Sequence, residues 1–176
     1  LLEQAVRFKK KLILLWFGLW KNAESAYVPA WMKQDSETFF RAEMYGGERL
    51  NTIFPLCWEA VERDAAAFSR LIGHLREVDK NSSVIMVQVE NEYGSYGESK
   101  EYVSQIRDIV RTNFGDVTLF QCDWASNFTK NALPDLLWTI NFGTGANIDQ
   151  QFAGLKKLRP DSPLMCSEFW SGWFDK

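Results

Sequence analysis

Histidine is almost absent from this chain of 176 residues, and cysteine is scarce. The one histidine, His74, falls inside an expected helix, so the chain has no HExxH metalloprotease motif and a Ser-His-Asp triad would have to use that helical position. The three cysteines cannot all pair within one chain, and their spacing matches no zinc site. We therefore expect a structural His74, buried free thiols at Cys122 and Cys166, and no metal site.

Long apolar runs, clustered basic residues and phosphate-binding loops are also missing. The apolar run over 12–20 is much shorter than the roughly 18 residues that a membrane helix needs. The net charge is −3 and the basic residues are scattered, unlike the basic stripe of a nucleic-acid-binding protein. No GxGxxG or GxxxxGKS/T motif occurs. We expect neither a membrane segment nor a nucleic-acid partner, and no signal peptide is visible, since Leu1 opens inside a helical pattern.

Aromatic residues, by contrast, make up 15% of the chain and include eight tryptophans. Trp20, Trp124, Trp170 and Trp173 come just after expected strands, where they could line a cleft. Aromatic faces stack on the apolar C–H faces of sugar rings, so such loops fit a carbohydrate ligand. They fit a large buried core equally well, and composition alone does not decide between the two.

Apolar periodicity divides the chain into alternating helices and strands. Helical spacing of apolar residues predicts helices over 1–10, 59–79, 99–112 and 148–158. Short apolar runs predict strands over 12–19, 84–90, 117–122, 136–141 and 164–167. The region 21–58 is too long for an idle connection, and we expect it to carry function or small helices.

Strands that alternate with helices predict an α/β fold with a parallel sheet and helices packed outside it. Candidate functional residues follow several successive strands: Trp20, Glu92, Asp123, Asn141 and Glu168. An active site built from the loops after successive strands is typical of the (β/α)8 TIM barrel, which has eight strands and about 250 residues. Five strands therefore predict a partial barrel, with 1–176 as a single catalytic-barrel segment truncated at both ends.

Two of the expected strands end on a carboxylate. Glu92 follows the apolar run of VQVENEYG, and Glu168 follows that of MCSEFWSGW. Ionised groups are costly to desolvate unless they have partners or a task. Carboxylates at the ends of two strands predict a paired-carboxylate site that cleaves glycosidic bonds. If the enzyme retains the anomeric configuration, the two carboxyl groups should lie about 5–5.5 Å apart.

These two stretches, together with LFQCDW (119–124) and NFGTGANID (141–149), resemble the β-galactosidases of glycoside hydrolase family 35. The resemblance runs from about residue 84 to the C-terminus, and it implies that the five strands are barrel strands three to seven. It also implies a retaining enzyme that cleaves terminal β-D-galactosyl residues from an oligo- or polysaccharide by double displacement. It implies no cofactor, and it suggests a bacterial source.

The resemblance also implies roles for individual residues. Glu92 matches the general acid/base on the fourth barrel strand, and Glu168 matches the nucleophile on the seventh. Asn91 matches the residue that bonds the sugar 2-hydroxyl. Trp170 and Trp173 lie in the loop that shapes the galactose subsite.

The front half departs from the usual family pattern. Residues 15–25 read LWFGLWKNAES, where the family typically carries Gly-Pro-Tyr and Ala-Glu-Trp segments, so only Glu24 remains as a candidate ligand of a sugar hydroxyl. Asn141, at the end of a later strand, is a further candidate substrate-binding residue. Glu90 alternates with Glu92 along the strand, so we expect it on the same face, as a supporting partner rather than a catalytic group. Asp123 is likewise expected to support the site.

Two alternatives stay open. One is an enzyme of the same fold with different sugar specificity. The other is a non-catalytic, truncated fragment that binds sugar weakly, because missing strands would leave sheet edges unpaired. The sequence leaves the linkage, the oligomeric state and the compartment open, although secretion or a periplasmic location fits the full enzyme.

Overall fold

The computed structural model describes residues 1–16, 28–54, 56–95 and 97–172. Its helices are α1 (Leu2–Arg7), α2 (Ala30–Gln34), α3 (Trp58–Val78), α4 (Lys100–Phe114), α5 (Phe128–Asn131) and α6 (Ile148–Leu158), with short 3₁₀ turns at Tyr93–Ser95 and Ala125–Asn127. Its strands are β1 (Leu12–Trp16), β2 (Arg41–Glu43), β3 (Arg49–Ile53), β4 (Val84–Asn91), β5 (Thr118–Asp123), β6 (Leu137–Gly143) and β7 (Cys166–Trp170). The four predicted helices and five predicted strands are present, within a few residues of their predicted ends.

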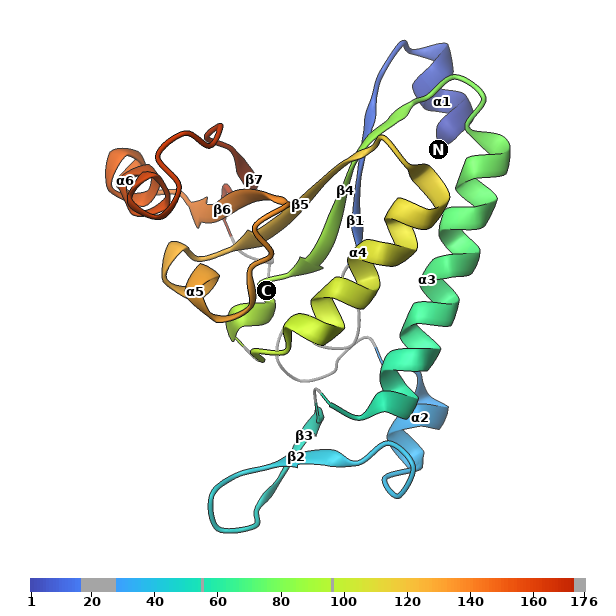
Figure 1. The fold of residues 1–176 in the computed structure, drawn as a ribbon, viewed down its shortest axis with the longest axis vertical. Helices are drawn as coiled ribbons and strands as arrows, with labels where there is room; N and C mark the ends of the chain where they lie inside the picture. The colour runs from blue at the N-terminus through green and yellow to red at the C-terminus, as the bar shows by residue number, and fades with distance from the viewer. Residues whose placement is uncertain (17–27, 55, 96, 173–176) are drawn as a thin grey trace.

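The main sheet contains five parallel strands in the order β1-β4-β5-β6-β7, which is their order along the chain. A doubly wound sheet reverses its strand order at a switch point, whereas this sheet does not reverse. The sheet curls from β1 to β7, and α3 and α4 lie side by side along one of its faces (Figure 1). The prediction of a partial (β/α)8 barrel is confirmed.

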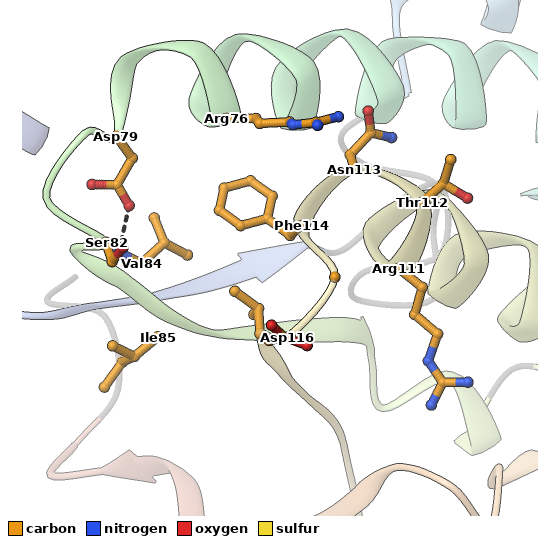
Figure 2. Close-up of a pocket in the computed structure, with 12 residues that line it drawn as sticks. Arg76, Asp79, Ser82, Val84, Ile85, Arg111, Thr112, Asn113, Phe114 and Asp116 are labelled. Atoms are coloured by element: carbon orange, nitrogen blue, oxygen red, sulfur yellow. Dashed lines mark hydrogen bonds between the residues drawn. The ribbon is translucent and has the colours of Figure 1, made fainter.

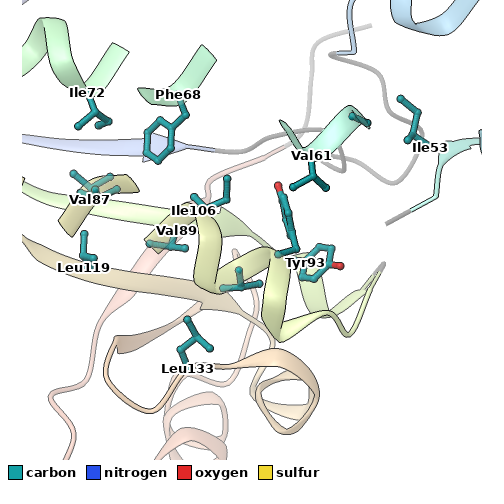
Figure 3. Close-up of a cluster of buried hydrophobic side chains, with 14 of the residues drawn as sticks. Ile53, Val61, Phe68, Ile72, Val87, Val89, Tyr93, Ile106, Leu119 and Leu133 are labelled. Atoms are coloured by element: carbon teal, nitrogen blue, oxygen red, sulfur yellow. The ribbon is translucent and has the colours of Figure 1, made fainter. Parts of the chain in front are cut away.

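The main core lies between β4 and the helices α3 and α4 (Figure 3). Phe68 and Ile72 from α3, Ile106 from α4, and Val87 and Val89 from β4 are each no more than 1% exposed. Burial of side chains of this size contributes about 1.5–3 kcal/mol each. This packing fixes the position of β4, and therefore of the residues that follow it.

The ends of α4 carry the expected signals. The Ser99 side chain accepts a hydrogen bond from the Tyr102 backbone N–H at 3.1 Å, which satisfies a backbone donor of the first turn. Gly115 ends the helix with a φ of 59°, a conformation that favours glycine. Gly115 is thus the C-terminal cap of α4.

The region 21–58 contains more structure than the sequence indicated. β2 and β3 form an antiparallel hairpin whose turn uses Gly46 and Gly47 at φ values of 116° and 87°. The hairpin projects near the end of the sheet where β1 and β4 finish (Figure 1). Its strands are short and largely exposed, so they carry little of the apolar alternation that identifies a strand in a sequence.

The scarce residues lie as the sequence predicts, with one exception. His74 is exposed on α3. All three cysteines are free thiols; Cys57 and Cys122 are buried, whereas Cys166, predicted to be buried, is only partly so because β7 lies at a sheet edge. Within the described ranges, no helix is long and apolar enough to cross a membrane.

Candidate active site

The curl of the sheet brings the two candidate catalytic carboxylates together. Glu92 directly follows β4, and Glu168 lies on β7, three strands away in the sheet. Three strand spacings in a flat sheet would separate them by roughly 14 Å. Instead, the side-chain amide Nδ2 of Asn141 on β6 donates to Glu92 Oε1 at 2.8 Å and to Glu168 Oε2 at 3.3 Å. The two oxygens can be no further apart than the sum of those distances, about 6 Å.

Glu168 accepts a hydrogen bond on each of its oxygens. In addition to the bond from Asn141, Oε1 accepts from the indole Nε1 of Trp170 at 2.8 Å. Asn141 and Glu168 are also directly paired across β6 and β7. Two donors on opposite oxygens fix the plane of the carboxylate, so Trp170 orients Glu168 as well as lying beside the predicted subsite.

The orientation of the Asn141 amide is itself set by a hydrogen bond from Cys122 on the neighbouring strand β5. The Cys122 thiol donates to Asn141 Oδ1, which leaves Nδ2 directed at the carboxylates. Burial raises the pKa of Cys122 to about 12, and the nearby charges of Glu168 and Glu92 add to the rise. The thiol therefore keeps its proton and remains a donor. The sequence predicted only a buried thiol here, because register between strands is invisible in it.

Asn91, the predicted partner of the sugar 2-hydroxyl, is held by its own strand. It is 1% exposed, and its Oδ1 accepts a hydrogen bond from Gln88 Nε2 at 2.8 Å. With Oδ1 accepting, the amide presents Nδ2 as its donor group. The contact with a sugar hydroxyl stays a prediction.

Glu90 does not share a face with Glu92, and that expectation is wrong. The pairing of β4 with β5 shifts register between Gln88 and Asn91, and both Glu90 and Glu92 have positive φ values, 64° and 53°. A bulge of this kind breaks the two-residue alternation of a strand. Glu90 consequently faces the helices, where its Oε1 accepts from the Tyr102 hydroxyl at 2.6 Å, while Glu92 reaches Asn141.

Asp123 ties the end of β5 to the loop that follows Glu92. It is 4% exposed, and its Oδ2 accepts from the backbone N–H of Gly94 at 2.8 Å. Its Oδ1 accepts from the Trp124 backbone and from Asn127 Nδ2, both at 2.8 Å. Burial raises the pKa of Asp123, and these hydrogen bonds oppose the rise. Asp123 thus supports the loop after Glu92, as expected from the sequence.

Aromatic rings gather beside the carboxylates. The rings of Trp124 and Trp170 lie 5.5 Å apart with an interplanar angle of 47°, and Trp124 is 37% exposed. Such a pair offers an apolar surface beside Glu168 on which a sugar ring could stack. Glu24 and Trp173, two other predicted substrate-binding residues, lie outside the described residues, as does Trp20.

A second group of acidic and phenolic side chains lies behind the site, between the sheet and the helices. Burial and the neighbouring charge of Glu90 raise the pKa of Asp64 on α3 to about 7, while hydrogen bonds with Trp16 and Tyr102 oppose the rise. Burial, followed by the charges of Glu90 and Asp64, raises the pKa of Tyr102. Near neutral pH, therefore, Asp64 holds a proton for much of the time and the tyrosine remains a donor.

The pocket in Figure 2, about 640 Å³ in volume, does not coincide with the carboxylates. Its lining includes Val84 and Ile85 at the start of β4 and 114–117 just before β5. It therefore lies at the amino ends of the strands, whereas Glu92 and Glu168 lie at the carboxyl ends, where β/α barrels place their active sites. Among the side chains that the structure describes, no group of three His, Cys, Asp or Glu could hold a metal ion.

Comparison with known sequences decides the family. The profile of Glycosyl hydrolases family 35 matches residues 20–176. The chain belongs to this family. The beta-galactosidase of Xanthomonas manihotis is 43% identical over 93 residues, which cover 52% of this chain and 15% of the relative. The beta-galactosidase of Homo sapiens is 46% identical over 96 residues, which cover 52% of this chain and 14% of the relative.

This family 35 chain thus spans only a small part of the length of the curated relatives that it matches. Because those relatives include mammalian proteins, a bacterial source finds no support. A solved structure of a beta-D-glucuronidase from Dictyoglomus thermophilum matches 63% of this chain and 21% of its own, with 21% identity and a TM-score of 0.48. That likeness is too remote to carry an argument.

Replacement of Gly94 by alanine should disturb the loop after Glu92. An added Cβ would lie 2.6 Å from Asp123 Oδ2 and 2.7 Å from Asn127 Cβ, closer than such atoms approach. We expect Gly94→Ala to lower the free energy of unfolding by about 1–3 kcal/mol in denaturant titration. Gly73→Ala on α3, where a Cβ meets nothing within 4 Å, should instead raise it by up to about 1 kcal/mol. Equal effects of the two changes would contradict this account.

Asp64→Asn should remove a pH dependence of stability. Folding raises the pKa of Asp64 from 3.8 to about 7. Between those pH values the unfolded chain releases a proton that the folded chain keeps, so stability falls as pH rises, by at most about 4 kcal/mol above pH 7. Asparagine cannot ionise, so the variant should gain stability over the original chain at about pH 8 but not at about pH 4. Denaturant titration measures both, with the exposed Asp161→Asn as control; a gain independent of pH would refute the assignment.

Proposed function

We propose that this chain carries the catalytic carboxylates of a retaining β-galactosidase, with Glu168 as nucleophile and Glu92 as general acid and base. The observation that carries the proposal is the bridge from the Asn141 amide to both carboxylates, which keeps Glu92 Oε1 and Glu168 Oε2 within about 6 Å of each other. Retaining glycosidases hold their carboxyl groups about 5–5.5 Å apart, and inverting ones about 6.5–9.5 Å. Since the chain spans a small part of its relatives, the activity is proposed for the natural full-length polypeptide that carries it.

The two roles are those that the family resemblance implies, and the contacts of Glu168 support its part in the reaction. Glu168, oriented by Trp170 and Asn141, attacks the anomeric carbon and forms a galactosyl ester as the glycosidic bond breaks. Glu92 gives its proton to the departing glycosidic oxygen. Glu92 then takes a proton from water, the water oxygen attacks the anomeric carbon, and the ester bond to Glu168 breaks. Two inversions release galactose in the β configuration.

The galactoside preference rests on the family and on relatives that are named beta-galactosidase. The substrate is a β-galactosidic oligo- or polysaccharide, whose terminal sugar would stack beside Trp124 and Trp170. Asn91 and, outside the described residues, Glu24 are the proposed ligands of its hydroxyl groups.

A panel of 4-nitrophenyl β-glycosides tests the substrate class. The full-length polypeptide should turn over the β-galactoside with a kcat/KM at least about tenfold above those of the β-glucoside and β-mannoside, because a site that bonds the axial 4-hydroxyl leaves polar groups unpaired with its epimer. A higher kcat/KM for another sugar would reject the proposed galactoside specificity but leave the proposed fold and reaction type standing. Absence of turnover on every glycoside would reject the enzymatic function.

Azide rescue tests the separate roles of the two carboxylates. Glu168→Ala should lose at least about a thousandfold in kcat on an activated aryl β-galactoside. Azide can then occupy the vacated place and, by a single displacement, give α-galactosyl azide. Glu92→Ala is the matched variant, in which azide attacks the ester on Glu168 after the first displacement and gives β-galactosyl azide. Product configuration is read by nuclear magnetic resonance, and the reverse pattern would exchange the two roles.

A further inference from the structure

The strand that delivers Glu92 to the site is distorted at its end. β4 shifts register against β5 after Gln88, and Glu90 and Glu92 both occupy the left-handed region, at φ 64° and 53°. Each such residue costs about 1–3 kcal/mol, so the conformation persists only where surrounding contacts hold it. The same distortion sends Glu92 toward Asn141 and Glu90 toward the helices.

The Glu90 carboxylate supplies two of those contacts. Its Oε2 accepts from the backbone N–H of Asn91 at 2.9 Å, and its Oε1 accepts from the Tyr102 hydroxyl of α4 at 2.6 Å. Hydrogen bonds to a carboxylate are shorter and stronger than those between neutral groups. Glu90 therefore connects the Glu90–Asn91 peptide, which lies one residue before Glu92, to Tyr102 of α4.

Asp64 extends this anchor to α3 and β1. The Trp16 indole Nε1 of β1 lies 3.4 Å from Asp64 Oδ2, and the Trp16 ring stacks on Phe68 of α3 at 4.3 Å. Asp64 lies near enough to Glu90 and Tyr102 for each to affect the other's protonation. The end of β4 is thus connected to both covering helices and to the neighbouring strand.

We propose that Glu90 and Tyr102 are positioning residues for the proton donor, which fix the backbone at Asn91 and so set the direction of Glu92 toward the glycosidic oxygen. The inference rests on the proposed function, since it concerns the same site. Neither residue touches substrate in this account. Loss of either anchor should let the end of β4 relax and move the Glu92 carboxyl away from the leaving group, and a misplacement of about 1 Å can cost about a hundredfold in rate.

Dependence on the leaving group distinguishes positioning from general damage. Methanol is a poor leaving group whose departure needs a proton, whereas 2,4-dinitrophenolate departs without one. Glu90→Gln and Tyr102→Phe should therefore lower kcat/KM for methyl β-galactoside by about 10–100-fold and for 2,4-dinitrophenyl β-galactoside by less than about threefold. Because kcat/KM reports the first displacement, the base-catalysed second step does not enter.

The experiment uses the natural full-length polypeptide, with Glu101→Gln as the matched control on the exposed side of α4. The control should change neither kcat/KM nor the ratio between the two substrates. Thermal unfolding identifies a variant that fails to fold. If Glu90→Gln fails to fold, Tyr102→Phe, which removes only one oxygen atom, tests the positioning role by itself. Equal losses on both substrates would overturn the positioning role while leaving the proposed function standing. Absence of turnover by the unmodified protein would instead remove the proposed function, and this inference with it.

Discussion

The Asn141 amide joins two carboxylates that come from strands three positions apart, and that contact depends on the curl of the sheet. Only a curled sheet can direct the ends of β4, β6 and β7 toward one point. Asn141 in turn depends on Cys122, whose buried thiol fixes which end of the amide faces the carboxylates. The hydrogen bond from Cys122 to Asn141 therefore decides whether Glu92 and Glu168, the proposed catalytic carboxylates, face a donor or an acceptor.

The second constraint acts along β4 rather than across the sheet. An undistorted strand would send Glu90 and Glu92 to the same face, placing three carboxylates on the side of Asn141 and leaving the helix side without an anchor. The bulge separates them, so one carboxylate faces the site and the other faces α3 and α4. The loop after Glu92 is held in the same way from β5, where Asp123 accepts the Gly94 backbone N–H. Glu92 is thus fixed by contacts on both sides of it along the chain.

Much of this arrangement could be predicted from the sequence, because apolar periodicity records which face of an element is buried. The long helix α3 and the strand β4 are the clearest examples, and the exits at Glu92 and Glu168 follow from where the apolar runs stop. A prediction from apolar periodicity assumes regular backbone geometry, however, and it is wrong where the backbone is irregular. Glu90 was placed on the wrong face because a positive φ leaves no trace in an apolar pattern. The Cys122–Asn141 bond was missed because it depends on register between strands.

The layer behind the site, between the sheet and the helices, contains ionisable side chains. Two carboxyl groups and a phenol lie between the sheet and the helices, in a layer where apolar side chains of similar size are often at least as stabilising as buried ionisable groups. Apolar contacts are not directional, so they could fill this space without holding a backbone N–H or a left-handed residue in place. A carboxylate can do both, because each oxygen accepts along a defined direction. The burial of Glu90 beside Asp64 therefore lowers stability but holds the peptide at Asn91 in place, one residue before Glu92, the proposed proton donor.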